Sequence, residues 1–145
     1  MGDVYSTGYI NDNATPPVKH IPQDGGGRVR YYRDTYVQGA SAGTIGDVIH
    51  MKKLPGCARV IPGGMIFWGT GTTNETLAVG ITGTAAKFLA ATAAATAGSA
   101  ALEAHLASGL DYIAPAAGGE VIVTNATAAI AAAQAITVHI PYVLD

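Results

Sequence analysis

The sequence predicts an all-β sandwich or barrel, and three observations lead to that class. Aromatic and β-branched residues gather in short runs, several of these runs alternate in polarity, and Gly/Pro turn signals separate them. A chain of 145 residues, 49% of them apolar, is expected to form one domain that buries enough surface to fold unaided. Its single cysteine, Cys57, allows no internal disulfide.

The clearest strand is predicted over residues 28–38, RVRYYRDTYVQ. One face of it is expected to pack on the core and carries Val29, Tyr31, Thr35 and Val37. Arg33 falls on the same face and would need an acidic partner, because an unpaired buried charge is costly. The other face carries Arg30, Tyr32, Asp34 and Tyr36.

The remaining strands follow at short intervals. They are expected at residues 47–54, 58–61, 65–68, 77–81, 101–106, 110–114, 120–124 and 135–144. Pro141 suggests that the last strand lies at a sheet edge or contains a bulge. Two alanine-rich segments favour helix by propensity alone, so a short helix is predicted over 85–91 and helical character over 126–135.

Residues 1–27 are predicted to form an extended arm ahead of a single β-sandwich domain over 28–145. Prolines prevent a regular helix there, and Gly25, Gly26 and Gly27 form a flexible joint. The arm also carries apolar side chains, namely Val4, Tyr5, Tyr9, Ile10, Val18 and Ile21. Such a segment gains most by lying in a groove, which belongs either to its own domain or to a neighbouring subunit.

The charge of the chain is low and unevenly distributed. Charged residues make up 12% of the sequence and the net charge is −2, which offers no electrostatic support for binding nucleic acid or an anionic membrane. The one basic residue after position 60 is Lys87. The second half is therefore expected either to pack tightly through small residues or to meet another protein.

Neither secretion nor membrane insertion is expected from the sequence. The first residues lack a basic region followed by an apolar core, so we expect no signal peptide and no glycosylation at the three N-x-T sites. The longest stretch without acidic or basic residues, 121–144, is too weakly apolar to span a bilayer.

No motif predicts catalysis, a cofactor or a metal. Residues 39–43 match G-x-S-x-G, but the segment after them has a strand pattern, which favours a small-residue loop over a nucleophile elbow. The glycines before Arg28 lack the remainder of a phosphate-binding motif. The four histidines (His20, His50, His105 and His139) and Cys57 show no metal-ligand spacing.

Several segments in order resemble small structural proteins of tailed bacteriophages that decorate, or cement, the capsid shell. These are G-R-V-R at 27–30, G-D-V-I at 46–49, K-L-P-G-C-A-R-V-I at 53–61, L-A-V-G-I at 77–81, K-F-L-A-A at 87–91 and Y-V-L-D at 142–145. The resemblance implies a jelly-roll-like antiparallel β-sandwich on the outer surface of a Hong Kong 97-type capsid. It also implies that the protein bridges neighbouring major capsid subunits and is itself a homo-oligomer, with a dimer favoured.

The leading hypothesis is therefore a capsid-stabilising virion protein without enzymatic activity. The residues expected to contact a partner lie in the arm and at the start of the first long strand: Tyr5, Tyr9, Ile10, Pro16, Pro17, Val18, Ile21, Arg28 and Arg30. The alternative is a virion fibre or a carbohydrate- or receptor-binding β-sandwich module. That alternative requires clustered exposed aromatic residues, whereas Trp68 lies in a core-like run.

Overall fold

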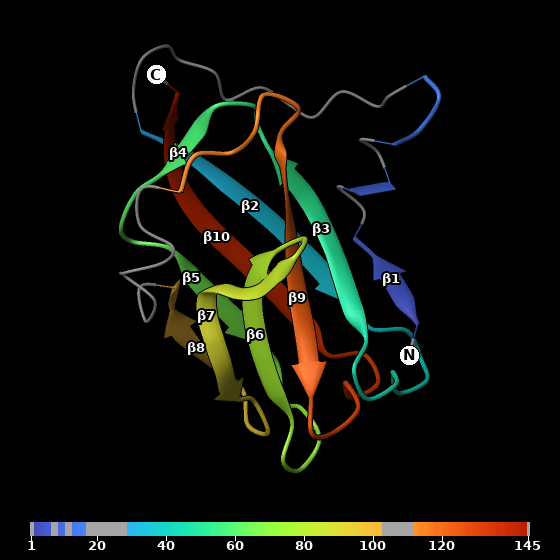
Figure 1. Cartoon of the computed structure of the whole chain (residues 1–145). Helices are drawn as coiled ribbons and strands as arrows, with labels where there is room; N and C mark the ends of the chain where they lie inside the picture. The colour runs from blue at the N-terminus through green and yellow to red at the C-terminus, as the bar shows by residue number, and fades with distance from the viewer. Residues whose placement is uncertain (1, 7–8, 11–12, 17–28, 103–111, 145) are drawn as a thin grey trace.

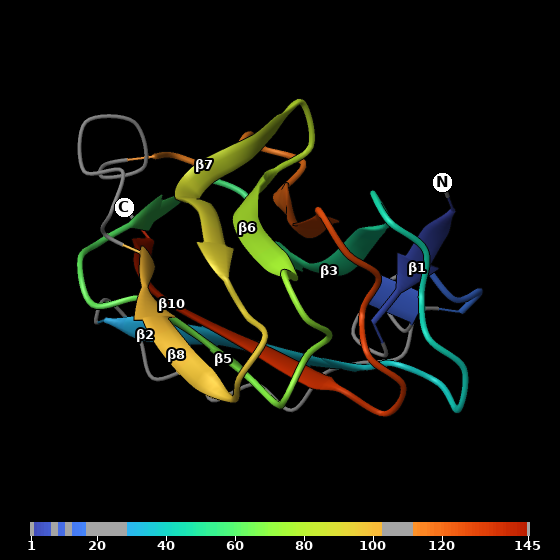
Figure 2. The ribbon, with the colours of Figure 1, turned by 90° about the horizontal axis from the view of Figure 1, so that it is seen from below.

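The computed structural model describes residues 2–6, 9–10, 13–16, 29–102 and 112–144. These residues form two facing β-sheets, which Figure 1 shows one behind the other and Figure 2 shows from the end as two layers. The predicted all-β sandwich is confirmed. Among the described residues, no helix is long and apolar enough to cross a membrane.

Each sheet contains five strands. The first sheet has the order β1-β3-β9-β6-β7 and consists of β1 (Asp3–Tyr5), β3 (Val48–Leu54), β9 (Gly119–Ala126), β6 (Thr76–Ile81) and β7 (Thr84–Ala93). The second has the order β2-β10-β5-β8 and consists of β2 (Arg30–Val37), β10 (Ala135–Leu144), β5 (Met65–Trp68) and β8 (Gly98–Ala101), with β4 (Ala58–Val60) also paired to β10.

The strand order is that of a jelly roll. Apart from the β6–β7 hairpin, neighbours within a sheet are distant in sequence, because most connections pass from one sheet to the other. All pairs between long strands are antiparallel. The jelly-roll arrangement expected from the resemblance is therefore present in this chain.

The core lies between the sheets; burial alternates along strands such as β3, whereas β6 buries four residues in a row. Its largest fully buried side chains include Tyr32, Phe88, Ile49, Met51, Leu54, Ile66, Leu77, Ile130, Ile136 and Ile140. Burying one side chain of this size contributes roughly 1.5–3 kcal/mol before conformational entropy is subtracted. The two layers are therefore held together mainly by apolar packing.

The predicted core face of β2 is wrong. Tyr32 and Tyr36 point into the core, whereas Tyr31 is 69% exposed and Val37 is 58% exposed. Both faces of this strand carry aromatic residues, so alternation alone does not choose between them, and the two inward tyrosine rings fill the space between the sheets. Arg33 is exposed on the outer face, so the reason for expecting a buried acidic partner disappears.

Both helix predictions are also wrong. Residues 85–91 belong to β7, whose pairing with β6 shifts register twice and allows the consecutive residues Phe88 and Leu89 both to be buried. Residues 127–134 form a loop between β9 and β10. In both segments tertiary packing and turn hydrogen bonds outweigh the helix propensity of alanine.

The C-terminal strand has the predicted bounds, and of the two arrangements predicted from Pro141, a sheet edge or a bulge, the edge position is wrong. β10 lies between β2 on one side and β5 and β4 on the other. Pro141 falls where its neighbour changes, after the pairing of His139 with Met65 and before that of Tyr142 with Val60. A residue without a backbone N–H is tolerated at this interruption of the ladder.

The predictions for residues 101–114 are tested only in part. The strand β8 covers Gly98–Ala101, and Ile113 forms an isolated bridge with Arg59. Most of the predicted strand over 101–106 and the start of that over 110–114 lie outside the described residues.

Candidate functional site

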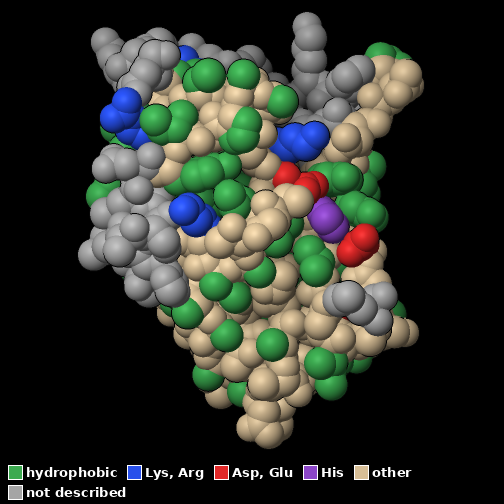
Figure 3. Space-filling model, in the orientation of Figure 1, with side chains coloured by type: hydrophobic (Ala, Val, Ile, Leu, Met, Phe, Trp, Pro, Cys, Tyr) green, Lys and Arg blue, Asp and Glu red, His purple; other side chains and the backbone are tan. Residues whose placement is uncertain are grey.

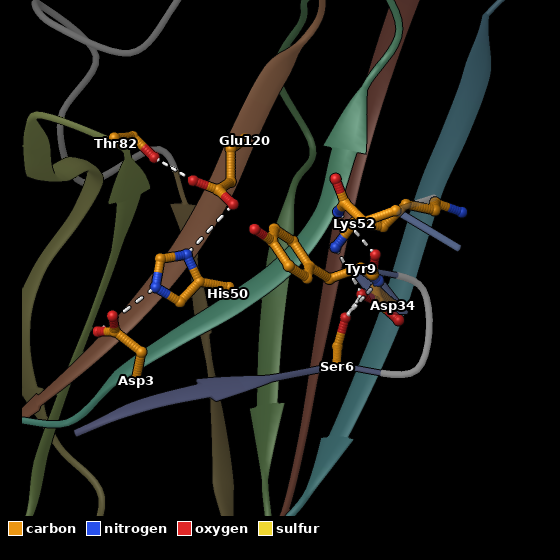
Figure 4. Close-up of polar contacts among 9 residues, drawn as sticks. Asp3, Ser6, Tyr9, Asp34, His50, Lys52, Thr82 and Glu120 are labelled. Atoms are coloured by element: carbon orange, nitrogen blue, oxygen red, sulfur yellow. Dashed lines mark hydrogen bonds and ion pairs between the residues drawn. The ribbon is translucent and has the colours of Figure 1, made fainter. Parts of the chain in front are cut away.

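The N-terminal strand β1 lies on the first sheet of its own domain. It pairs in parallel with β3, and the Ser6 N–H then donates a hydrogen bond to the His50 carbonyl over 2.8 Å. Ser6 is buried, and its hydroxyl donates to Asp34 Oδ2 over 2.5 Å. The same carboxylate oxygen accepts a 2.7 Å bond from the Lys52 N–H, as Figure 4 shows. Asp34 of β2 therefore links the second sheet to β3 and to the N-terminal segment.

The residues after β1 form a helical turn rather than a continuous extended arm. The Ile10 N–H donates to the Ser6 carbonyl over 3.0 Å, and the Tyr9 N–H donates to the Ser6 hydroxyl oxygen over 3.1 Å. This turn brings Tyr9 back over β3, where its ring stacks on Tyr5 with 4.7 Å between centroids. The described start of the predicted arm therefore lies against its own domain.

A histidine lies between two carboxylates beneath these rings. His50 Nδ1 is 3.2 Å from Glu120 Oε1, and His50 Nε2 is 3.6 Å from Asp3 Oδ1 (Figure 4). The Tyr5 ring stacks on the imidazole with 4.9 Å between centroids. The Thr82 hydroxyl donates to the other Glu120 oxygen, which orients that carboxylate. This cluster joins β1, β3 and β9 on the outer face of the first sheet.

The surroundings of the Tyr9 hydroxyl in this cluster favour its neutral form. Burial raises the pKa of the Tyr9 hydroxyl above the ordinary 10.0, and Glu120, Tyr5 and Asp3 raise it further. Tyr9 is therefore neutral at physiological pH, as an ordinary tyrosine is, and the contacts of its ring in this cluster are the stacking on Tyr5 and a tilted contact with His50.

The predicted contact residues do not all fall in one place. Tyr5 is 43% exposed, Ile10 is 57% exposed and Pro16 is exposed. Arg30 is half-buried at the start of β2, opposite Tyr142 of β10. Pro17, Val18, Ile21 and Arg28 lie outside the described residues. The structure thus brings Tyr5 and Tyr9 together and leaves Ile10 open to a partner.

A second surface was missed because the faces of β2 were predicted in reverse. The outer face of the second sheet carries exposed Tyr31 and Val37 from β2 and Phe67 from β5, which is 44% exposed. Arg33 lies on this face beside His139, and burial together with the Arg33 charge lowers the pKa of the imidazole. No pattern within β2 identifies this face, because Tyr31 on one side and Tyr32 and Tyr36 on the other give both faces aromatic character.

The G-x-S-x-G segment and Cys57 lie in separate loops of the structure. Ser41 of the G-x-S-x-G segment is exposed in the loop between β2 and β3, without the strand–turn–helix geometry of a nucleophile elbow. Cys57 is exposed in the turn before β4. No group of three potential metal ligands occurs among the residues that the structure describes, which exclude His20 and His105.

No protein-family model and no curated protein matches the sequence. Two solved structures contain chains of the same fold. A chain in the capsid of Ralstonia phage GP4 is 20% identical, with a TM-score of 0.76, and the match covers 99% of each chain. A chain in the cyanophage Pam1 capsid asymmetric unit is 22% identical, with a TM-score of 0.65, over 92% of this chain and 97% of that one. This chain therefore has the fold of chains found in two bacteriophage capsids.

Proposed function

We propose that this chain is a structural protein of a bacteriophage virion that associates with the capsid. The observation that carries the proposal is the likeness to the chain in the Ralstonia phage GP4 capsid, which extends over 99% of both chains with a TM-score of 0.76. The likeness to the Pam1 chain gives independent support.

The finer proposal is a decoration, or cement, protein. It binds the outside of a Hong Kong 97-type shell and bridges neighbouring major capsid subunits, and it acts as a homo-oligomer with a dimer favoured. Such a protein works by burying surface between subunits, so that the shell cannot open without breaking those contacts. The exposed apolar side chains of the second sheet and of the N-terminal segment, including Tyr31, Phe67 and Ile10, are suited to such burial.

The alternative role as a fibre or a glycan-binding module receives less support. Trp68, the only tryptophan, is buried, and its indole N–H donates to the Thr96 carbonyl over 2.8 Å. Tyr31 and Phe67 are exposed on one face but lie on strands separated by β10. They do not form the contiguous aromatic platform that sugar stacking requires.

A reconstitution experiment tests the proposal. Purified protein is mixed with empty shells assembled from the major capsid protein encoded in the same genome, and the shells are recovered by sedimentation. We expect saturable binding at a fixed ratio to the capsid subunit and a higher temperature of shell opening. Absence of binding, or binding only to tail structures, would contradict the proposal.

A further inference from the structure

One end of the sandwich is formed by four loops and carries no exposed charge. The loops are residues 38–47, 69–75, 94–97 and 127–134, all of which the structure describes, and they lie together at the bottom of Figure 1. Their only ionisable acids or bases are Asp47 and Glu75, which are 3% and 0% exposed. In Figure 3 the lowest part of the molecule accordingly shows hydrophobic and other side chains without red or blue. We call these loops, together with Val37 and Phe67, the uncharged end.

Buried polar side chains fix the shape of these loops from inside. Asp47 accepts bonds from the Thr44 N–H over 2.7 Å and the Gly2 N–H over 3.2 Å. Asn125 donates to the carbonyls of Thr44 and Ala128. Glu75 accepts from the Thr72 N–H over 2.9 Å. The two acids and Asn125 are thus used to hold the backbone, and the polar side chains that these loops still expose are uncharged, namely Ser41, Thr44, Thr73, Asn74, Thr96 and Thr127.

The loops are also bonded to one another. The Gly43 N–H donates to the Ile130 carbonyl over 2.9 Å and joins the first loop to the last. The Thr72 hydroxyl donates to the Ala129 carbonyl over 2.5 Å, and the Gly71 N–H donates to the Ala95 carbonyl over 3.2 Å. These bonds connect all four loops into one surface, so little backbone conformational freedom remains to be lost on binding.

The exposed side chains of this end are mostly small, with three larger apolar exceptions. Ala40, Ser41 and Ala97 are exposed, and side chains of this size lose little entropy when they are covered. Val37 and Ile45 are each 58% exposed, and Phe67 is 44% exposed on the adjoining face of the second sheet. A preformed, charge-free surface with apolar anchors has the character of an interface core, in which charged residues are depleted.

From these observations we infer that the uncharged end is the surface through which this protein docks on the capsid shell, against a patch that is itself low in charge. This inference rests on the proposed function. Sheets about 10 Å apart, each of five strands spaced about 4.8 Å apart, give an end of roughly 240 Å², under a third of the roughly 800 Å² that each partner contributes to a standard interface. That area is too small to hold a second copy alone but suits one of several contacts made by a bridging protein.

Charge insertion tests the inference. The double variant Ala40→Lys/Ala97→Lys and its counterpart Ala40→Glu/Ala97→Glu place charges on two separate loops of the uncharged end. Both should bind shells about tenfold or more weakly than the parent, because either sign of charge must then be desolvated without a partner. The matched control is Ala85→Lys/Ala116→Lys, which adds the same charge at exposed alanines toward the opposite end and should bind as the parent does.

Further measurements on each variant distinguish a folding defect or altered self-association from a change in shell binding. Thermal melting of each variant and light scattering of its mass show that it is folded and whether self-association has changed. Parent-like shell binding by both uncharged-end variants would overturn the inference and leave the proposed function standing. Tighter shell binding by the lysine variant would show an acidic partner and would also overturn the inference. Loss of self-association with unchanged shell binding would overturn it as well, because the uncharged end would then hold a second copy of the chain. A parent protein that does not bind shells would overturn the proposed function itself.

Discussion

At the scale of single residues, the Asp34 carboxylate connects the N-terminal segment, β2 and β3 by hydrogen bonds. Its carboxylate accepts from the Ser6 hydroxyl, the Lys52 N–H and the Thr35 N–H, and these donors belong to three different segments. Alternation along β2 predicts an outward Asp34, because its bonds to Ser6 and Lys52 depend on how the two sheets pack, which no local pattern reveals. The residue is half-buried between the layers.

Replacing Asp34 should therefore loosen the N-terminal segment. Asp34→Ala is expected to lower the free energy of unfolding by about 1–3 kcal/mol, because buried donors lose their acceptor. Asp3→Ala is the control, since that acid is largely exposed and its ion pair with His50 is expected to contribute less than about 1 kcal/mol. Urea unfolding measures both values. Equal losses in the two variants would contradict the assigned role of Asp34.

Glu75 gives a prediction about pH. Burial raises the pKa of its carboxyl above the ordinary 4.5, although the bonds from Thr72 and Gln134 act in the opposite direction. Between 4.5 and the raised value, the folded protein holds this proton while the unfolded chain has released it, so the Glu75 contribution to stability falls as pH rises through that window.

The variant Glu75→Gln should remove this dependence. Its free energy of unfolding is expected to exceed that of the parent by an amount that grows with pH from 4.5 upward and then levels off above the raised pKa. Urea unfolding of both proteins across this range measures the difference. A difference that stays constant with pH would show that Glu75 titrates at the same pH in the folded and unfolded states.

At the scale of elements, local pattern was sufficient where polarity and turn signals agreed. β5 and β10 have the predicted bounds, since proline and glycine precede β5, and β10 alternates β-branched residues such as Ile136 and Val138. β7 could not be predicted in this way, because its alanines favour helix and only pairing with β6 makes them a strand. The uncharged end likewise depends on connectivity, which brings four separate loops together.

The N-terminal segment was predicted to be an extended arm, but its first residues form a strand of the first sheet. β1 pairs with β3, Val4 packs against the core and Ser6 is buried. Deleting residues 1–22 should therefore lower the melting temperature by roughly 5–10 °C, because a loss of about 1 kcal/mol corresponds to several degrees in a chain of this size. Differential scanning calorimetry measures the change. An unchanged melting temperature would mean that the segment contributes nothing to its own domain.

The same truncation separates two roles of the segment. Ile10 and Tyr5 remain partly exposed and are available to a partner. If they contact the shell, occupancy of the truncated protein on empty shells should also fall, measured at a temperature where it is fully folded. A truncated protein that is less stable yet decorates shells at full occupancy would show that the segment serves its own domain alone.

At the scale of the whole molecule, the low share of charged residues agrees with the proposed role in the capsid. The low charge noted in the sequence has two structural sources: small residues in the strands of the jelly roll, and the end of the sandwich where only buried acids occur. Both expectations raised by the composition, tight packing and a protein-facing surface, are compatible with one molecule. A β-sandwich with exposed apolar side chains on its N-terminal segment, its sheet face and its loops is suited to the proposed contacts with other subunits.

Cryo-electron microscopy of purified virions tests the proposal that this chain lies on the outer surface of the capsid. The account predicts density for a two-layered jelly roll outside the shell, over the boundaries between major capsid subunits, with the four loops at residues 38–47, 69–75, 94–97 and 127–134 turned toward the shell. Density for the chain in the tail, inside the shell or nowhere in the particle would contradict it.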